Sequence, residues 1–158
     1  MFTSWNFKGL GRALKRGKVM SHLKHLSSDR IFLQETHIHS NEQRCLRANW
    51  VSKVYWSTFT SKARGVAILI RKTTPFIFGS VVTDPDGRFV LVSGSINSFP
   101  LVLLNIYAPN FDCPDFFSKI FDLISEYNMS NIIGGDFNCY FDPVLDRLST
   151  KIALTTRS

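Results

Sequence analysis

The stretch NIIGGDFNCYFDPVLDR, residues 131–147, begins as a short apolar run, passes two glycines and then carries Asp136 and Asn138. An Ile-containing run bounded by glycines is typical of a buried strand that ends in a turn. The strand is therefore expected to present a carboxylate and an amide at the edge of a sheet. Side chains of these two kinds can hold a cation, a water molecule or a phosphate, so this edge is a candidate functional site.

The chain before this strand alternates between strand-like and helix-like patterns. Compact apolar or aromatic runs indicate strands, and apolar residues three or four positions apart indicate helices. In the last helix, Phe117, Ile120, Phe121 and Ile124 are expected to share the buried face. The patterns predict strands at 2–6, 30–35, 65–71, 76–82, 88–96, 100–108 and up to Gly134, and helices at 12–27, 41–48 and 114–127.

Several of the predicted strands follow one another without a helix between them, so the chain is not a doubly wound sheet of repeated strand–helix–strand units. The pattern predicts one α/β domain over residues 1–158, built as a sheet-rich sandwich flanked by helices. In that architecture, the polar residues at the carboxyl ends of successive strands gather along one edge.

Composition bounds the classes of function. A hydrophobic content of 44%, including 14 Phe, predicts a substantial core rather than a disordered tail. Nineteen Lys and Arg against twelve Asp and Glu give a net charge of +7, which favours a polyanionic partner. The three cysteines are widely spaced and form no CxxC pair, so neither a zinc knuckle nor a disulfide framework is indicated. No apolar run is long enough to cross a bilayer.

The N-terminal segment contains no acidic residue before Asp29 but several Lys and Arg. This composition resembles a mitochondrial transit peptide. We favour the alternative of a basic amphipathic helix that follows a first strand, because residues 2–7 already have a strand pattern.

Four separate strands end on an acid, an amide or a phenol. Asn6 ends the first strand, and Gln34 and Glu35 end the second. Asn105 and Tyr107 lie near the end of a later strand, and Asp136 and Asn138 end the last. Mg²⁺ needs only one or two protein carboxylates together with water and substrate phosphates. Glu35 fits the role of ligand, and Asp136 fits that of orienting a water. Each residue taken singly also fits a structural role, as a cap or a turn residue.

Five strings of the sequence occur in a characteristic order: WNFKGLG, FLQETH, RGVAILI, NIYAPN and GGDFNCYFDPVLDR. Together they resemble the endonuclease/exonuclease/phosphatase superfamily, which includes deoxyribonuclease I and the apurinic endonucleases. The resemblance is strongest to the endonuclease domain of non-LTR (LINE-type) retrotransposon polyproteins, and it covers residues 6–147. The combination is specific, although no single string is.

The resemblance implies a deoxyribonuclease I-like fold and Mg²⁺-dependent hydrolysis of a DNA phosphodiester. By it, Glu35 and Asn6 match the metal-site residues, and Tyr107 matches the tyrosine that supports the scissile phosphate. Asp136 matches the aspartate that positions the attacking water, and Asn138 the asparagine that contacts phosphate. In retrotransposons the resulting nick primes a reverse transcriptase, which follows in the same polyprotein.

The pair Asp146 and Arg147 matches a DR pair found after GDFN in retrotransposon members, and Arg147 is expected to bind substrate. The superfamily completes its site with a later Asp and His, and nothing of this kind follows Arg147. We therefore expect a C-terminally truncated copy that lacks the last strands and is inactive as a fragment. His37 and His39, two positions apart, are weighed as substitutes, and the family string makes that role the weaker interpretation.

Two other functions stay open. One is a non-catalytic remnant that binds nucleic acid through its basic surface. The other is a phosphatase or sphingomyelinase-like enzyme of the same superfamily, which the net charge and the string DPVLDR disfavour. The retrotransposon role implies intracellular, and specifically nuclear, action.

Overall fold

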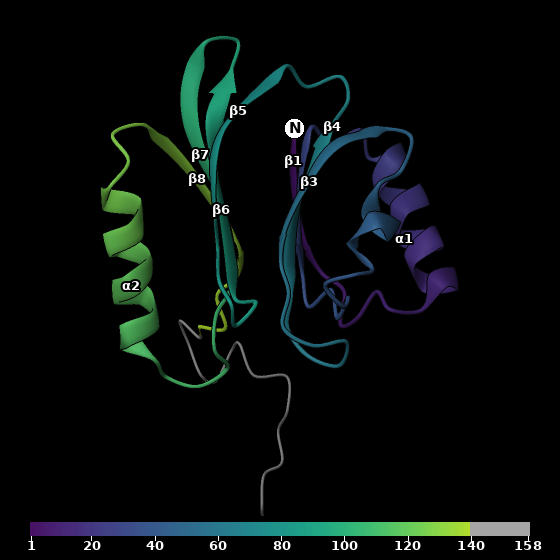
Figure 1. Ribbon diagram of the computed structural model, residues 1–158, viewed down its shortest axis with the longest axis horizontal. Helices are drawn as coiled ribbons and strands as arrows, with labels where there is room; N and C mark the ends of the chain where they lie inside the picture. The colour runs from purple at the N-terminus through teal and green to yellow at the C-terminus, as the bar shows by residue number, and fades with distance from the viewer. Residues whose placement is uncertain (140–158) are drawn as a thin grey trace, which may run out of the picture.

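The computed structural model describes residues 1–139, which form two four-stranded sheets packed face to face. Figure 1 shows four layers, with α1 outside one sheet and α2 outside the other. The predicted α/β sandwich is therefore confirmed. No helix in the described part is both long and apolar enough to cross a membrane. The elements are β1 Phe2–Asn6, α1 Ala13–His25, β2 Arg30–Gln34, the 3-10 helix η1 Gln43–Leu46, β3 Val51–Ser57, β4 Val66–Arg71, β5 Phe76–Thr83, β6 Phe89–Ile96, β7 Phe99–Tyr107, α2 Pro114–Ser125 and β8 Ser130–Asp136.

Each sheet contains one parallel pair of strands joined by a helix. The first sheet has the order β1-β2-β4-β3, and β1 runs parallel to β2 across α1. The second has the order β5-β6-β7-β8, and β7 runs parallel to β8 across α2. All other neighbours are antiparallel. The two parallel pairs face each other across the sandwich, because β1 and β2 both contact β8.

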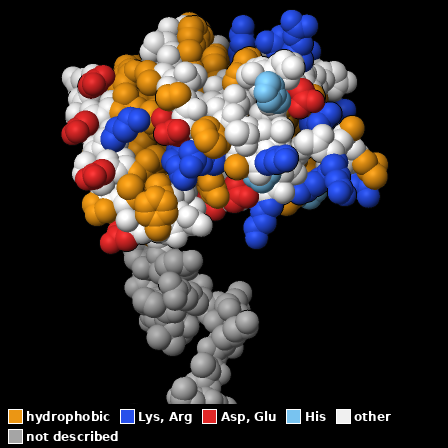
Figure 2. Space-filling model, turned by 60° about the horizontal axis from the view of Figure 1, so that its bottom comes forward, with side chains coloured by type: hydrophobic (Ala, Val, Ile, Leu, Met, Phe, Trp, Pro, Cys, Tyr) orange, Lys and Arg blue, Asp and Glu red, His pale blue; other side chains and the backbone are white. Residues whose placement is uncertain are grey.

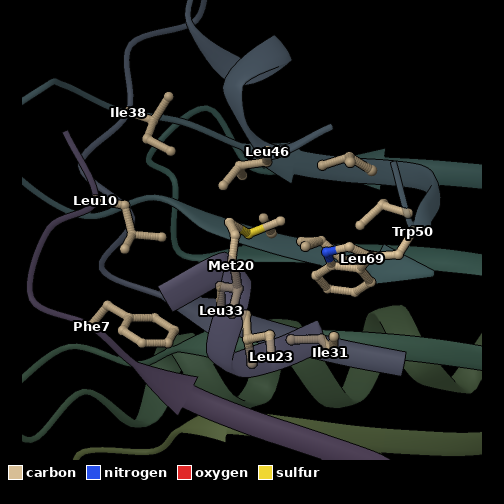
Figure 3. Packing of buried hydrophobic residues seen from close by; sticks show 13 residues of the cluster. Phe7, Leu10, Met20, Leu23, Ile31, Leu33, Ile38, Leu46, Trp50 and Leu69 are labelled. Atoms are coloured by element: carbon tan, nitrogen blue, oxygen red, sulfur yellow. The ribbon is translucent and has the colours of Figure 1, made fainter. Parts of the chain in front are cut away.

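Three apolar clusters hold the layers together. One lies between α1 and the first sheet, where Met20 and Leu23 pack on Ile31 and Leu33 (Figure 3). A second lies between the two sheets, and the third lies between the second sheet and α2. The inter-sheet cluster consists of Phe32, Val66, Ile68, Ile70, Val90, Val92, Leu101 and Leu103. Because several of these side chains are fully buried, removal of one is expected to leave a cavity.

Two details differ from the predictions. Strand β3 was not predicted, because a bulge between Val51 and Lys53 breaks the period-two alternation that marks a strand. In α2, Phe121 is 65% exposed, so its assignment to the buried face is wrong. The helix packs through Phe116, Phe117, Ile120, Leu123 and Ile124 instead. The short helix predicted at 41–48 is η1, and the helix predicted at 12–27 is α1.

The two glycines at the end of β8 allow close packing. A Cβ on Gly134 would approach the rings of Phe2 and Phe32 to 3.0 Å or less. Gly135 has φ +137°, and a Cβ there would overlap the carbonyl of Ile106 in β7. The glycines thus let β8 lie against β7 and deliver Asp136 to the strand end.

We expect Gly135→Ala to lower the free energy of unfolding by about 1–3 kcal/mol, because it adds a clash at a backbone conformation that L-residues avoid. Gly17→Ala is the matched control, since Gly17 lies within α1 and nothing stands within 4 Å of its added Cβ. Gly17→Ala is expected to raise the free energy of unfolding by about 0.5–1 kcal/mol. Urea unfolding measures both, and equal effects would contradict this account.

Candidate active site

The carboxyl ends of the two parallel pairs meet at one end of the sandwich, the lower end in Figure 1. In the first sheet, Asn6 of β1 is in register with Gln34 of β2, and Glu35 follows directly. In the second sheet, Tyr107 of β7 is in register with Asp136 of β8. Since β1 and β8 contact each other across the sandwich, these four strand ends lie together.

The side-chain amide of Asn6 joins the two sheets. Its Nδ2 donates to Oε1 of Glu35 at 3.0 Å and to Oδ2 of Asp136 at 2.8 Å. The Oδ1 of Asn6 accepts from the backbone N–H of Lys8 at 3.0 Å, which orients the amide. Two carboxylates from different sheets therefore point at one site, which a cation or another hydrogen-bond donor can share.

The backbone at the site adopts conformations that non-glycine residues seldom take. Glu35 has φ +50° and Asn138 has φ +47°. The backbone N–H of Asn138 donates to Oδ1 of Asp136 at 3.0 Å, and its Nδ2 donates to the carbonyl of Ala108 at 2.7 Å. Residues held in the left-handed region cluster at functional sites, where the surrounding structure imposes the strain. These two angles support the functional interpretation of Glu35 and Asn138.

Tyr107 lies beside both carboxylates. Its partial burial, a hydrogen bond with Glu35 and the negative charges of Glu35 and Asp136 raise the pKa of Tyr107 to about 12. The phenol therefore remains protonated, and able to donate a hydrogen bond, at any physiological pH.

A raised pKa means that folding favours the neutral phenol, so this contribution to stability is lost as the pH rises from about 10 towards about 12. Ultraviolet absorbance measures phenolate formation as the pH is raised, and the difference between the wild type and Tyr107→Phe isolates Tyr107. We expect this residue to ionise at a higher pH than an ordinary tyrosine. Glu35→Gln removes a charge and should move that ionisation to lower pH. An unchanged midpoint in Glu35→Gln would contradict the assigned cause.

The two histidines considered as substitute ligands do not act as a pair. The Nε2 of His37 lies 3.5 Å from Oε2 of Glu35, on the carboxylate oxygen that Asn6 does not contact. His39 is exposed and its Nδ1 lies 2.9 Å from Oδ1 of Asn41. Of the two histidines, only His37 lies at the site, where its ring contacts the carboxylate of Glu35.

Two polar residues predicted to reach the edge are buried instead. Gln34 and Asn105 are 1% and 0% exposed. The Nε2 of Gln34 donates to Oδ1 of Asn105 at 2.6 Å, and Nδ2 of Asn105 donates to the carbonyls of Leu33 and Ala67 at 2.9 and 2.8 Å. These amides fasten the two sheets to each other just beneath the site.

One cation near the site was not anticipated from the sequence. Arg88, which precedes β6, has its guanidinium 5.7 Å from the ring centre of Tyr107 and donates to the Tyr107 carbonyl at 3.3 Å. Partial burial and the neighbouring Arg64 lower the pKa of Arg88. In the sequence it simply follows the turn 84–87, and no local pattern marks it. Arg88 is positioned to attract an anion towards Tyr107.

The oxygen ligands that this site offers suit a hard cation. Glu35 and Asp136 supply carboxylate oxygens, and among residues 1–139 the side chains that hydrogen-bond to them carry no sulfur ligand. Within residues 1–139, no group of three or more His, Cys, Asp or Glu side chains forms a closed cage. An ion held here would need water or substrate oxygens to complete its shell, which is the usual condition of Mg²⁺.

Charge is unevenly distributed around the site. Figure 2 shows the lower end of the molecule, with most Asp and Glu towards α2 and most Lys and Arg towards α1. Two of the α1 cations have structural partners, since Lys15 donates to the carbonyl of Phe7 at 2.6 Å and Arg16 to that of Leu10 at 3.0 Å. Lys18 of α1, and Lys8 and Arg12 in the segment before the helix, are exposed and can attract a polyanion.

The pair Asp146 and Arg147 lies outside the described residues, so the substrate-binding role of Arg147 stays a prediction. The four strand-end residues and Asn138 are all brought together. They come from both sheets and are spread from residue 6 to residue 138, so the site forms only when the two sheets pack together.

No protein-family model matches the chain. Among solved structures, TDP2 from Caenorhabditis elegans superposes with a TM-score of 0.66 at 22% identity, over 87% of this chain and 47% of that one. A Danio rerio TDP2 humanised by 14 mutations gives 0.65 at 21% identity, over 87% and 62%. A truncated C. elegans TDP2 gives 0.61 at 21%, over 81% and 56%. The chain thus has the deoxyribonuclease I-like fold, and it spans about half the length of these structures.

Proposed function

We propose that this chain carries the metal-binding half of a phosphodiesterase site that acts on DNA. The observation that carries the proposal is the convergence of Glu35 and Asp136, from different sheets, on the amide of Asn6. The shared fold with TDP2, a phosphodiesterase, supports it. So does the resemblance of the sequence strings to metal-dependent nucleases.

Mg²⁺ is the expected ion, with Glu35 as its protein ligand and Asn6 beside it. The ion would neutralise charge on the phosphate and act as a Lewis acid. The second carboxylate, on Asp136, accepts hydrogen bonds and can orient a water for attack on phosphorus. The Asn6 amide and the Asn138 N–H donate to its two oxygens and hold the carboxylate in place.

Tyr107 and Asn138 are proposed to hold the scissile phosphate. The phenol of Tyr107 hydrogen-bonds to Glu35 in this structure. With Glu35 bound to the ion, the same O–H would be released to donate to the phosphate without adding negative charge, and Arg88 supplies a positive charge next to it. The Asn138 amide is anchored on the Ala108 carbonyl, which leaves one N–H to donate to an oxygen of the phosphate. Preorganised donors of this kind stabilise charge that develops in the transition state.

The finer proposal is a DNA-nicking domain of a LINE-type retrotransposon. It rests on the sequence strings, above all GGDFNCYFDPVLDR. In that role a reverse transcriptase domain would belong to the same polyprotein, and the protein would act inside the cell, in the nucleus. The net charge of +7 agrees with a DNA substrate.

A second candidate function is DNA binding without hydrolysis. One observation favours it: in residues 1–139 the hydrogen bonds to Asp136 come from Asn6 and Asn138 and none comes from a histidine. A water held at Asp136 would then have no histidine of residues 1–139 to take up its proton, and a general base is worth about 10²–10⁴-fold in rate.

A supercoiled-plasmid nicking assay separates the two functions. The wild type is compared with a Glu35→Ala, Asp136→Ala double variant, each with Mg²⁺ and with EDTA. Nicking by the wild type alone, abolished by EDTA, supports the phosphodiesterase. Equal background nicking, together with retained binding to labelled DNA by the folded proteins, supports the binding function. Loss of both properties would contradict both.

A further inference from the structure

A cavity adjoins the candidate site on the α2 side. Its volume is about 370 Å³, within the range of small-molecule sites of roughly 300–1,000 Å³. It lies between the loop from β7 to α2 and the segment after β8, and Asn138 lines it. Asn138 therefore belongs both to the candidate site and to this cavity. Asn110, Phe111, Asp112 and Phe117 also line it.

Two aromatic side chains, Phe111 and Phe117, line the cavity, and they differ in how tightly they pack against the rest of the protein. Phe117 is packed in the cluster beneath α2 and meets Phe116 edge to face, with ring centres 5.4 Å apart. Phe111 is 64% exposed, and in the described part of the chain it belongs to no apolar cluster and no aromatic pair. The Phe111 ring is therefore accessible to a ligand in the cavity, and contact with a ligand would cost the fold little.

The polar lining identifies the chemistry of that ligand. The amides of Asn110 and Asn138 offer both donors and acceptors, as the edge of a nucleobase requires. The carboxylate of Asp112 lines the same cavity and repels a phosphate. A flat, neutral, hydrogen-bonding ring suits this lining better than an anion or an aliphatic group.

The cavity is also fixed relative to the candidate site. The Asn138 amide donates to the Ala108 carbonyl at 2.7 Å, and the Ala108 N–H donates to the Asp136 carbonyl at 2.8 Å. A nucleotide whose phosphate is held at Asn138 can therefore extend its own base, or a neighbouring one, towards Phe111.

We infer that this cavity is a subsite for an unpaired nucleobase, stacked on Phe111, next to the phosphate bound at Asn138. The inference rests on the proposed function, since it takes DNA as the ligand. A base within a duplex is stacked and paired and does not enter such a cavity, so the subsite favours DNA with an extrahelical or single-stranded base.

The test measures binding without hydrolysis. Fluorescence anisotropy in EDTA compares a duplex that carries one bulged base with the fully paired duplex. The variants are Phe111→Ala, Phe111→Tyr and, as a matched control, Phe121→Ala, whose ring is 65% exposed on α2 and does not line the cavity. Circular dichroism establishes that each variant is folded.

The wild type is expected to bind the bulged duplex more tightly than the paired one. Phe111→Ala should lower affinity for the bulged duplex by about 5- to 150-fold, the range for loss of one base–aromatic stack, and leave the paired duplex unaffected. Phe111→Tyr should retain wild-type affinity, and Phe121→Ala should change nothing.

Equal affinity of the wild type for both duplexes, or equal losses in Phe111→Ala and Phe121→Ala, would overturn the subsite. The plasmid assay reports separately on the proposed function. Metal-dependent nicking without a Phe111 effect overturns the subsite alone. A Phe111 effect without nicking overturns only the hydrolysis and supports the subsite.

Discussion

Glu35→Gln is expected to lower Mg²⁺-dependent nicking by about 10²–10³-fold, the range for loss of one preorganised electrostatic contact. The substitution removes a charge but keeps the shape and an oxygen that can accept from Asn6, and it leaves the Asn6–Asp136 bond between the sheets untouched. The effect is thus assigned to the loss of the metal ligand rather than to unfolding. Initial nicking rates across a series of Mg²⁺ concentrations measure it.

The Mg²⁺ series distinguishes the two carboxylates. Glu35→Gln should raise the Mg²⁺ concentration for half-maximal activity, whereas Asp136→Asn should lower the maximal rate more than it shifts that concentration. Because both act on one phosphate, the double variant should be little worse than either single one. Glu42→Gln, at an exposed position before η1, is the matched control. A loss as large in Glu42→Gln would overturn the assignment.

Asn105→Ala is expected to lower the free energy of unfolding by about 3–5 kcal/mol. Asn105 is fully buried, and its amide bonds to Gln34 and to two carbonyls of the opposite sheet. Truncation leaves those buried partners without a bond at about 1–3 kcal/mol for each group, and it also leaves a cavity.

Urea unfolding followed by circular dichroism measures the effect, with Asn131→Ala as the control because Asn131 is exposed on β8. The control should change the free energy of unfolding by no more than about 0.5 kcal/mol. A similar small change in Asn105→Ala would mean that the sheets are held together without the amide pair.

The elements with strong local patterns were predictable. Helix α1 and strands β2, β4, β6 and β7 follow from apolar spacing alone, because a helix buries every third or fourth residue and an interior strand buries a continuous run. Strand β3 was missed because its bulge disturbs the alternation. The buried face of α2 was assigned one residue wrongly, at Phe121, because several registers of a Phe-rich helix look equally apolar.

The residues of the candidate site also form two groups, those that the sequence identified and those that only the packing of the sheets brings there. Glu35, Tyr107, Asp136 and Asn138 could be named because each directly follows or ends an apolar run, and the strings around them resemble a known superfamily. The buried roles of Gln34 and Asn105 could not be foreseen, because they depend on which residues of the opposite sheet lie across from them. Arg88 was missed for the same reason, since only the pairing of β6 with β7 brings it to Tyr107.

Local chemistry thus determined the strands, the helices and the polar residue that ends each strand, because side-chain period and turn preference act over a few positions. The tertiary structure decided that Asn6 lies between Glu35 and Asp136, 29 and 130 positions away along the chain. No local pattern encodes that meeting. It results from packing two sheets so that both bury their apolar faces, which brings the ends of their parallel pairs to one edge.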